Sequence, residues 1–277
     1  MIKIIFIDID GTLKDRFARI PQSIYEVIAL CKQKGIHVCL CTGRSVSMIQ
    51  EDVKQLSIAN MIAGGGNYIV VNGNKIFQDS FAQEEIEYIL SCGIVDKEAL
   101  FFESNEEVFM NKKAKEILVT MNKKMMEDMT QEQKQYYHAN EKIVYEENLH
   151  TFCKTFHRIH KIGIWCEEKT FACICEKIRN YQLVQKSCWG NLNYYEFVKC
   201  GCDKGSAVQK VMSHLGLTKD MSMCFGNGQN DITMFQQCSI AVAMEDGDEQ
   251  LKPYASSVCE AAHEDGIFKE LRRRKII

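Results

Sequence analysis

Residues 1–14 read MIKIIFIDIDGTLK, an apolar stretch that ends abruptly in two acids. Ile2 and Ile4–Ile7 form a near-continuous apolar run, which is typical of a strand buried on both faces of a parallel sheet. Asp8 and Asp10 stand i, i+2 at the end of that strand, where an open α/β sheet binds its ligands. Both are therefore candidate functional residues. The alternative is that they only end the strand, because Asp and Gly are common in turns.

The composition is that of an ordinary globular protein. The chain has 277 residues, enough for one large domain or two moderate ones, with 46% hydrophobic and 26% charged residues. It contains no run of about 18 apolar residues that would predict a membrane span, and its first stretch is too short and too acidic for a secretory signal. A net charge of −3 gives no basis for a nucleic-acid partner. We therefore expect a cytoplasmic protein without a nucleic-acid or membrane partner; the sequence says nothing of the oligomeric state.

The fourteen cysteines do not predict a metal site. No CxxC pair occurs, so the spacing typical of zinc sites is absent. Without a signal peptide, small buried thiols in a reduced protein are the expected use of these residues. The four histidines of the central region also lack a metal-binding spacing; they are His138, His150, His157 and His160.

Strand and helix patterns alternate after the first strand. Residues 21–34 carry the apolar spacing of an amphipathic helix, 36–41 read as a second buried strand, and another helix is expected from about residue 46. Such alternation predicts right-handed βαβ units and a parallel sheet. The second strand ends in Thr42-Gly43-Arg44, so Thr42 is expected beside Asp8. A hydroxyl with free N–H groups there suits a phosphate oxygen, and a simple helix N-cap explains Thr42 equally well.

The regular alternation of strand and helix patterns is absent from residue 83 to residue 186. We interpret this stretch as an inserted α/β domain. A predicted Asn72-Gly73 hairpin leads the chain toward it. Within the insert, 112–126 read as a helix, and 142–146 and 162–166 read as strands.

Two more candidate clusters follow the insert. An alternating strand at 194–198 precedes a helix whose first turn contains Lys204. Because the helix dipole is positive there, a lysine breaks a local rule and is a candidate functional residue; an exposed lysine reaching water is the alternative. A buried strand at 223–225 then ends in a polar loop, 226–231, which carries Asn227, Asn230 and Asp231.

These strand ends supply the side chains used in magnesium-assisted phosphoryl transfer. Carboxylate oxygens suit Mg²⁺, a carboxylate can act as a nucleophile, and a lysine with a hydroxyl can neutralise phosphoryl oxygens. In chain order the motifs are DxDGTL at 8–13, TGR at 42–44, Lys204 and GNGQND at 226–231. This order resembles the four motifs of the haloacid dehalogenase superfamily, and the long insert resembles the C2-type cap of its Cof-type phosphatases.

The resemblance implies a Rossmann-like parallel-sheet core in three layers, α/β/α, formed by 1–82 and 187–277. It implies an α/β cap, 83–186, that selects the substrate. Asp8 would be the nucleophile, and Asp10 would protonate the leaving alcohol and then activate water. Thr42, Gly43 and Lys204 would hold the phosphoryl group, with Asn230 contacting phosphate. The implied Mg²⁺ site consists of Asp8, the main-chain carbonyl of Asp10, Asn227 and Asp231, which orients metal-bound water.

Two positions depart from the family pattern. Relatives usually carry Asp at the position of Asn227, as a direct Mg²⁺ ligand. An amide oxygen can still coordinate, but with one negative charge fewer we expect weaker metal binding. Residues 245–247 read Glu-Asp-Gly where relatives often have Gly-Asn-Ala, and the sequence gives no reason for this difference.

We therefore expect a Mg²⁺-dependent phosphatase that acts through an aspartyl phosphate on a small phosphorylated metabolite, a sugar phosphate or a phosphorylated cofactor. Alternatives in the same fold are a dedicated sugar phosphatase of the sucrose or mannosyl-glycerate kind, or a phosphomutase, although no cap group that would retain a bisphosphate is identified. A weakly active or inactive phosphometabolite-binding protein is favoured by Asn227 and opposed by Asp8 and Asp10. A phosphoacceptor signalling receiver is disfavoured, because receivers lack the insert and carry the accepting Asp on a later, central strand.

Overall fold

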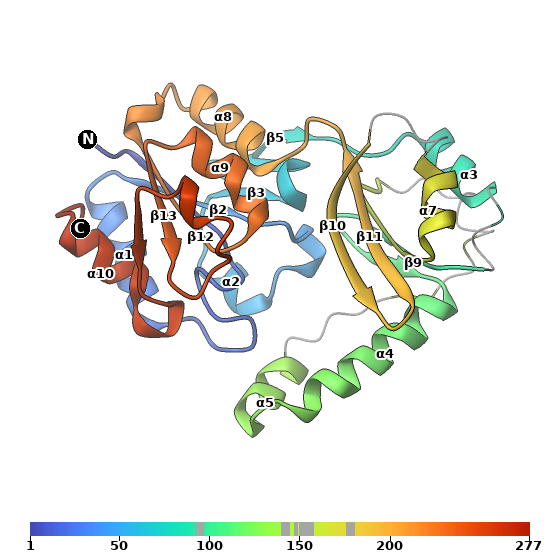
Figure 1. Ribbon diagram of the computed structural model, residues 1–277. Helices are drawn as coiled ribbons and strands as arrows, with labels where there is room; N and C mark the ends of the chain where they lie inside the picture. Colours follow the sequence, from blue (N-terminus) through green and yellow to red (C-terminus); the bar gives the residue numbers. More distant parts are fainter. Residues whose placement is uncertain (92, 94–96, 140–144, 147–148, 150–157, 176–180) are drawn as a thin grey trace. The chain divides into compact units, whose positions relative to one another are not determined.

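The computed structural model describes residues 1–91, 93, 97–139, 145–146, 149, 158–175 and 181–277. These residues form two compact units (Figure 1). Unit 1 contains Met1–Arg44, Ile49–Gln78 and Cys202–Ile277, and unit 2 contains Ser45–Met48 and Asp79–Gly201. None of the described helices is both long and apolar enough to cross a membrane.

Unit 1 is built on an eight-stranded sheet in the order β14-β13-β12-β1-β2-β3-β4-β5. The central strand β1 (Ile4–Ile7) pairs in parallel with both β12 (Ser222–Gly226) and β2 (His37–Cys41). All four residues of β1 are buried, as its apolar run predicts. The parallel part continues through β3 (Asn60–Ala63), β13 (Ile240–Met244) and β14 (Ser257–Cys259), and β4 (Tyr68–Val71) and β5 (Asn74–Gln78) close one edge in antiparallel pairing.

Helices form a layer on each side of this sheet. α8 (Lys204–His214) and α9 (Ile232–Gln237) pack against the face where Ile4 and Phe6 are buried. α1 (Gln22–Gln33) and α10 (Gly266–Arg273) contact each other and strands β2 and β14, and neither contributes to that described cluster. Successive residues of a strand point to opposite faces. All four residues of β1 are buried, so the second face of the sheet is covered as well. The predicted three-layer α/β fold with a parallel-dominated sheet is confirmed.

The helix predicted from about residue 46 is shorter in the structure. Residues Val46–Met48 form a 3₁₀ turn, and α2 (Glu51–Gln55) begins only at Glu51. The hydroxyls of Ser45 and Ser47 lie 3.0 Å apart, and Ser47 donates a hydrogen bond to the carbonyl of Ser104. Serine hydroxyls that bond locally or to other segments compete with helix formation, which explains the interruption.

Unit 2 contains a six-stranded, largely antiparallel sheet in the order β10-β11-β9-β6-β7-β8. Leu100, Phe102 and Ile162 are buried on one face together with residues of α3 (Gln83–Ser91) and α7 (Glu168–Cys175). On the other face Phe101 and Trp165 pack with α4 (Lys112–Glu127), which α5 (Gln131–Ala139) follows. The strands are β6 (Ala99–Glu103), β7 (Val108–Met110), β8 (Tyr145–Glu146), β9 (Lys161–Cys166), β10 (Tyr181–Trp189) and β11 (Leu192–Lys199).

Unit 2 extends beyond the predicted insert, 83–186. The strand predicted at 194–198 is part of β11. β11 pairs with β9 and β10 and so belongs to unit 2, whereas residues 187–277 were expected to belong to the core. An alternating pattern indicates a half-buried strand but does not say which sheet the strand joins. The helix predicted at 112–126 and the strand at 162–166 correspond to α4 and β9. Of the strand predicted at 142–146 only β8 is described, and His150 and His157 lie outside the described residues.

Candidate active site

The carboxyl ends of β1, β2 and β12 meet at one edge of the unit 1 sheet. The three strands are neighbours, and Ile7 of β1 is in register with Leu40 of β2 and Phe225 of β12. Asp8, Thr42 and the loop that follows Gly226 therefore begin side by side, as the sequence predicts. The Asp8 N–H extends the ladder by donating to the carbonyl of Phe225 at 3.1 Å.

Lys204 joins this edge from the start of α8. Its Nζ donates to Asp8 Oδ1 and to Asp231 Oδ1, each at 2.6 Å, and the exposed fractions of the three side chains are 1%, 8% and 0%. α8 begins here because Asp203 and Ser206 form a capping box, which places Lys204 in the first turn. The lysine that breaks the helix-dipole rule is thus held by two buried carboxylates, and the alternative of an exposed lysine is not what the structure shows.

A close approach of α8 and α9 brings Lys204 near Asp231. Gly205 makes this approach feasible, because a Cβ at Gly205 would collide with the carbonyl of Thr233. The Gly205 N–H instead donates to the hydroxyl of Thr233 at 3.1 Å. A small residue directly after Lys204 is therefore required by the packing of the two helices.

Burial and neighbouring charges shift the pKa values of Asp8 and Lys204. Burial raises the pKa of Asp8 to about 7, with Lys204 opposing the shift and the charges of Asp231 and Asp10 adding to it. Burial disfavours the ammonium of Lys204, but Asp231 and Asp8 outweigh burial and raise the pKa of Lys204 above its usual range. Lys204 is therefore charged at neutral pH.

Asp10 has a different partner, Arg44, whose role the sequence pattern did not indicate. Arg44 Nε and Nη2 donate to the two carboxylate oxygens of Asp10 at 2.5 and 2.7 Å. Burial would raise the pKa of Asp10, but Arg44, helped by the charges of Arg16 and Lys14, holds it below its usual range. The signal that could have revealed Arg44 is its place in TGR, at the end of the strand next to the acids.

The loop of residues 226–231 is folded around the Asp231 side chain. Its Oδ2 accepts hydrogen bonds from the N–H groups of Asn227 and Gly228, both at 3.0 Å, while Oδ1 accepts from Lys204. Asp231 therefore shapes the loop and orients Lys204. Asn227 Oδ1 accepts a hydrogen bond from Thr12 Oγ1 at 3.3 Å, which brings the first and last motifs together.

Glycines allow the motifs to lie this close. Gly11 has a φ of +80°, and a Cβ there would collide with the amide of Asn227. A Cβ on Gly43 would lie 3.4 Å from Asn230 Nδ2, so the amide of Asn230 is beside the second motif. Thr42 is buried, and its Oγ1 accepts the Arg44 N–H at 3.1 Å within the turn. It is not a helix N-cap, because the next α-helix, α2, begins at Glu51 with Gln50 as its N-cap.

Oxygen atoms at this edge fit a magnesium ion. Among the described residues no hydrogen bond ends on Asp8 Oδ2 or on the main-chain oxygen of Asp10, and Asn227 Oδ1 adds an amide oxygen. Hard oxygen donors such as these are the ligands that Mg²⁺ prefers. The described part of the chain contains no group of three or more His, Cys, Asp or Glu side chains placed to hold a metal. A metal here would therefore rely on main-chain and amide oxygens besides Asp8.

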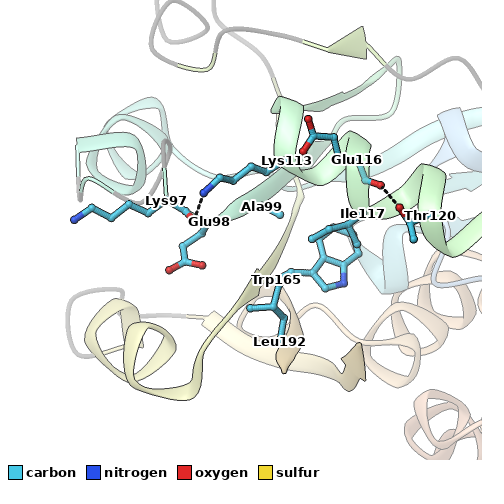
Figure 2. Close-up of a pocket in the computed structure, with 9 residues that line it drawn as sticks. All are labelled: Lys97, Glu98, Ala99, Lys113, Glu116, Ile117, Thr120, Trp165 and Leu192. Carbon is cyan, nitrogen blue, oxygen red and sulfur yellow. Dashed lines mark hydrogen bonds between the residues drawn. The ribbon is translucent and has the colours of Figure 1, made fainter. Parts of the chain in front are cut away.

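Unit 2 has a cavity of about 310 Å³ between α4 and its sheet (Figure 2). Ala99, Ile117, Trp165 and Leu192 provide its apolar lining. Two polar groups at its rim are already paired, as the dashed lines show: Lys113 Nζ donates to the carbonyl of Lys97 at 2.7 Å, and Thr120 Oγ1 to that of Glu116 at 2.9 Å. None of the predicted site residues lines this cavity.

Comparison with known proteins identifies the family. Residues 5–271 match the model of the haloacid dehalogenase-like hydrolases. YkrA of Bacillus subtilis (strain 168) is 26% identical over 268 residues, which cover 96% of this chain and 95% of that protein. The 5-amino-6-(5-phospho-D-ribitylamino)uracil phosphatase YcsE of the same organism is 24% identical over 277 residues, covering 98% of this chain and 95% of that protein.

Solved structures share the fold. A protein of Geobacillus kaustophilus HTA426 superimposes with a TM-score of 0.82 at 23% identity, covering all of both chains. The haloacid dehalogenase subclass IIB sugar phosphatase BT4131 superimposes with a TM-score of 0.76 at 24% identity, covering 99% of this chain and all of the other. With strand ends that carry the four motifs in order, and a family model that matches nearly the whole length, this chain is a member of the haloacid dehalogenase-like hydrolases, in line with the predicted phosphatase class.

Proposed function

We propose that the protein is a Mg²⁺-dependent phosphatase that hydrolyses a small phosphorylated metabolite, a sugar phosphate or a phosphorylated cofactor, through an aspartyl phosphate. The observation that carries this proposal is the buried Asp8–Lys204–Asp231 arrangement at the end of three parallel strands. One oxygen of Asp8 is held by Lys204 and the other accepts no hydrogen bond from the described residues. A carboxylate oriented in this way has one oxygen free to attack phosphorus.

In the first step Asp8 Oδ2 forms a bond to phosphorus while the bond between phosphorus and the alcohol oxygen breaks. Asp10 donates its proton to that oxygen, so that the alcohol leaves neutral. In the second step water attacks the aspartyl phosphate, Asp10 accepts a proton from it, and inorganic phosphate leaves Asp8. Lys204, Thr42, the Gly43 N–H and Asn230 hold the phosphoryl oxygens throughout.

Arg44 determines whether Asp10 is ionised before the reaction begins. While both guanidinium bonds are in place, Asp10 is a carboxylate, which is the form that the second step requires. The first step requires a proton on Asp10, so Arg44 has to give up at least one of its two bonds before the alcohol leaves. Arg44 is therefore a positioning residue for the acid–base group.

Asp8, the main-chain oxygen of Asp10 and Asn227 would hold Mg²⁺, with Asp231 orienting its water. When bound, the ion supplies positive charge that draws electron density from the phosphoryl group. The residues that would hold the ion offer only oxygen atoms to it. One of them, Asp8, is a carboxylate, and burial raises its pKa. A cation beside Asp8 would favour the ionised form that attacks phosphorus.

The test is the steady-state hydrolysis of p-nitrophenyl phosphate with and without Mg²⁺. We expect turnover that Asp8→Asn abolishes and that Asp220→Asn, a change of an exposed acid of unit 1, leaves unchanged. Turnover in the wild type that is no higher than the background would instead favour a phosphometabolite-binding protein. Turnover that persists in Asp8→Asn would exclude Asp8 as the nucleophile.

A further inference from the structure

Three glycines and an asparagine, residues 64–67, form a loop at the same edge of the unit 1 sheet as the candidate active site. This glycine loop connects β3 to β4, and β3 pairs in parallel with β2, so the loop begins beside the end of the strand that precedes Thr42. All three glycines have a positive φ, +59°, +66° and +116°. Because other residues rarely adopt such angles at successive positions, the path of this loop depends on glycine.

Two main-chain hydrogen bonds tie the glycine loop to the turn of the second motif. The Gly64 N–H donates to the carbonyl of Arg44 at 2.7 Å, and the Gly65 N–H donates to the carbonyl of Thr42 at 3.0 Å. The carbonyl of Thr42 and the N–H of Gly43 belong to one planar trans peptide unit, in which the two groups point in opposite directions. The bond from Gly65 therefore fixes the direction of the Gly43 N–H, which points away from the glycine loop.

The glycine loop also lies against the start of α8. A Cβ on Gly66 would lie 2.5 Å from the carbonyl oxygen and 2.9 Å from the carbonyl carbon of Asp203, closer than a Cβ comes to other heavy atoms. Asp203 is the N-cap residue of α8, so Gly66 touches the backbone directly before Lys204. A side chain at position 66 would have to push the first turn of α8, and Lys204 with it, away from the loop.

Asn67 closes the glycine loop from the inside. Its Nδ2 donates to the carbonyl of Gly64 at 2.6 Å, and the residue is 0% exposed. Its Oδ1 has no hydrogen-bond partner among the described residues, and a buried polar atom without a partner costs about 1–3 kcal/mol. An apolar side chain would avoid this cost. The bond to Gly64 is therefore what the amide contributes at this position.

The contacts of the glycine loop join groups from two distant segments. Thr42 and Gly43 follow β2, whereas Lys204 begins α8, and residues 79–201 of unit 2 separate the two in the sequence. One phosphoryl group held by both segments requires a constant distance between them, because a misplacement of about 1 Å can cost about 10²-fold in rate. The glycine loop contacts both segments, and all of these contacts lie within unit 1.

We propose that the glycine loop is a positioning element of the phosphoryl site. It sets the direction of the Gly43 N–H and the distance between the second motif and Lys204, and Gly66 and Asn67 are its positioning residues. Neither of them has to touch the ligand. The inference rests on the proposed phosphatase function for the identity of that ligand, a phosphoryl group or inorganic phosphate.

The experiment measures the inhibition constant of inorganic phosphate in the hydrolysis of p-nitrophenyl phosphate. Because an inhibition constant does not depend on how much of the enzyme is folded, it separates the geometry of the site from a loss of folded protein. Gly66→Ala should raise this constant by about tenfold or more. Gly73→Ala is the matched control, since Gly73 also has a positive φ, +78°, and nothing lies within 4 Å of a Cβ there. It should leave the constant within about threefold.

Asn67→Ala is a second test that adds no collision and covers the case that Gly66→Ala does not fold. Loss of the bond to Gly64 should raise the phosphate constant by about fivefold. Its control is Asn74→Ala, which removes a similar bond, from Asn74 Nδ2 to the carbonyl of Asn72, in an exposed turn. That variant should leave the constant within about threefold.

An unchanged constant in both Gly66→Ala and Asn67→Ala would overturn the inference, as would equal rises in Gly66→Ala and Gly73→Ala. A wild type that does not hydrolyse p-nitrophenyl phosphate would refute the proposed function. Calorimetric titration of the same variants with inorganic phosphate then tests the inference by itself, with the same expected factors in the dissociation constant. A wild type that neither hydrolyses the ester nor binds phosphate would overturn both.

Discussion

Each unit of this protein buries a lysine between two carboxylates, but the two arrangements differ in closeness. In unit 1 Lys204 lies 2.6 Å from both Asp8 and Asp231. In unit 2 Lys161 lies 3.3 and 3.4 Å from Glu103 and Glu196. In both cases burial disfavours the ammonium and the carboxylates outweigh burial, so the pKa of each lysine is raised.

The same set of charges, one lysine and two carboxylates, is therefore arranged differently in the two units. The short bonds of unit 1 fix one oxygen of Asp8 and leave the other in a defined direction, which suits the proposed role of Asp8 as nucleophile. In unit 2 Lys161 lies farther from both carboxylates. One oxygen of Glu103 and both amide atoms of Asn105 have no hydrogen-bond partner among the described residues. In the first arrangement one oxygen of Asp8 accepts no hydrogen bond from the described residues, and in the second it is an oxygen of Glu103 that has no such partner.

Replacing each of the two lysines separately should give the largest difference in stability and activity between the two arrangements. In Lys204→Met the two acids Asp8 and Asp231 stay buried without a cation, so the free energy of unfolding should fall by about 3–5 kcal/mol. Hydrolysis of p-nitrophenyl phosphate should fall about 10²–10³-fold. Lys161→Met should cost less stability, about 1–3 kcal/mol, and leave this hydrolysis within about threefold. Urea denaturation and steady-state kinetics measure both; equal kinetic losses in the two variants would show that the lysines are not functionally distinct.

The buried imidazole of His160 should make unit 2 sensitive to acid. The pKa of His160 is lowered from 6.5 to about 4 by burial, so between these values the unfolded chain binds more protons than the folded one. Its contribution to stability is complete above pH 6.5 and is lost as the pH falls toward 4. At pH 5 the free energy of unfolding should be about 2 kcal/mol lower than at pH 7 on this account.

Tryptophan fluorescence isolates this effect, because both tryptophans, Trp165 and Trp189, belong to unit 2. Urea titrations at pH 5 and pH 7 should show the difference in the wild type, and it should shrink in His160→Leu. A dependence on pH that is the same in the two proteins would contradict the assignment to His160.

The proposed metal site of unit 1 offers a further test with a smaller expected effect. Asn227→Asp restores a negative charge among the oxygen donors and should lower the Mg²⁺ concentration for half-maximal activity by about tenfold, or about 1.4 kcal/mol. Asn230→Asp, which changes the neighbouring amide of the same loop, is the matched control and should not lower it. A requirement for Mg²⁺ that is unchanged in Asn227→Asp would count against Asn227 as a ligand.

Much of unit 1 could be predicted, for a physical reason. Strands that are buried on both faces read as apolar runs, and parallel neighbours bring their carboxyl ends together whatever the loops between them do. The positions of Asp8, Thr42 and the loop after Gly226 follow from these two facts alone. Lys204 could be singled out because it breaks a local electrostatic rule, and the structure shows the two acids that compensate it.

The unpredicted features depend on contacts between distant parts of the chain. Glu103, Lys161 and Glu196 come from three strands, and nothing near any of them in the sequence indicates the other two. The pairing of β11 with β9 rather than with the core is of the same kind, since an alternating pattern fits either sheet. The contact of Arg44 with Asp10 depends on a side-chain direction that the TGR motif does not specify.

Unit 2 is not one continuous stretch of chain, and this matters for how such domains can be exchanged. Residues 45–48 belong to it, with Met48 packed on its apolar cluster and Ser47 bonded to Ser104, so the backbone passes between the units four times. A graft of residues 79–201 onto another core would leave this short piece behind, together with its hydrogen bond to the turn that holds Asn105. Recombination that transfers the whole of unit 2 between relatives would therefore have to transfer two separate pieces of the gene together.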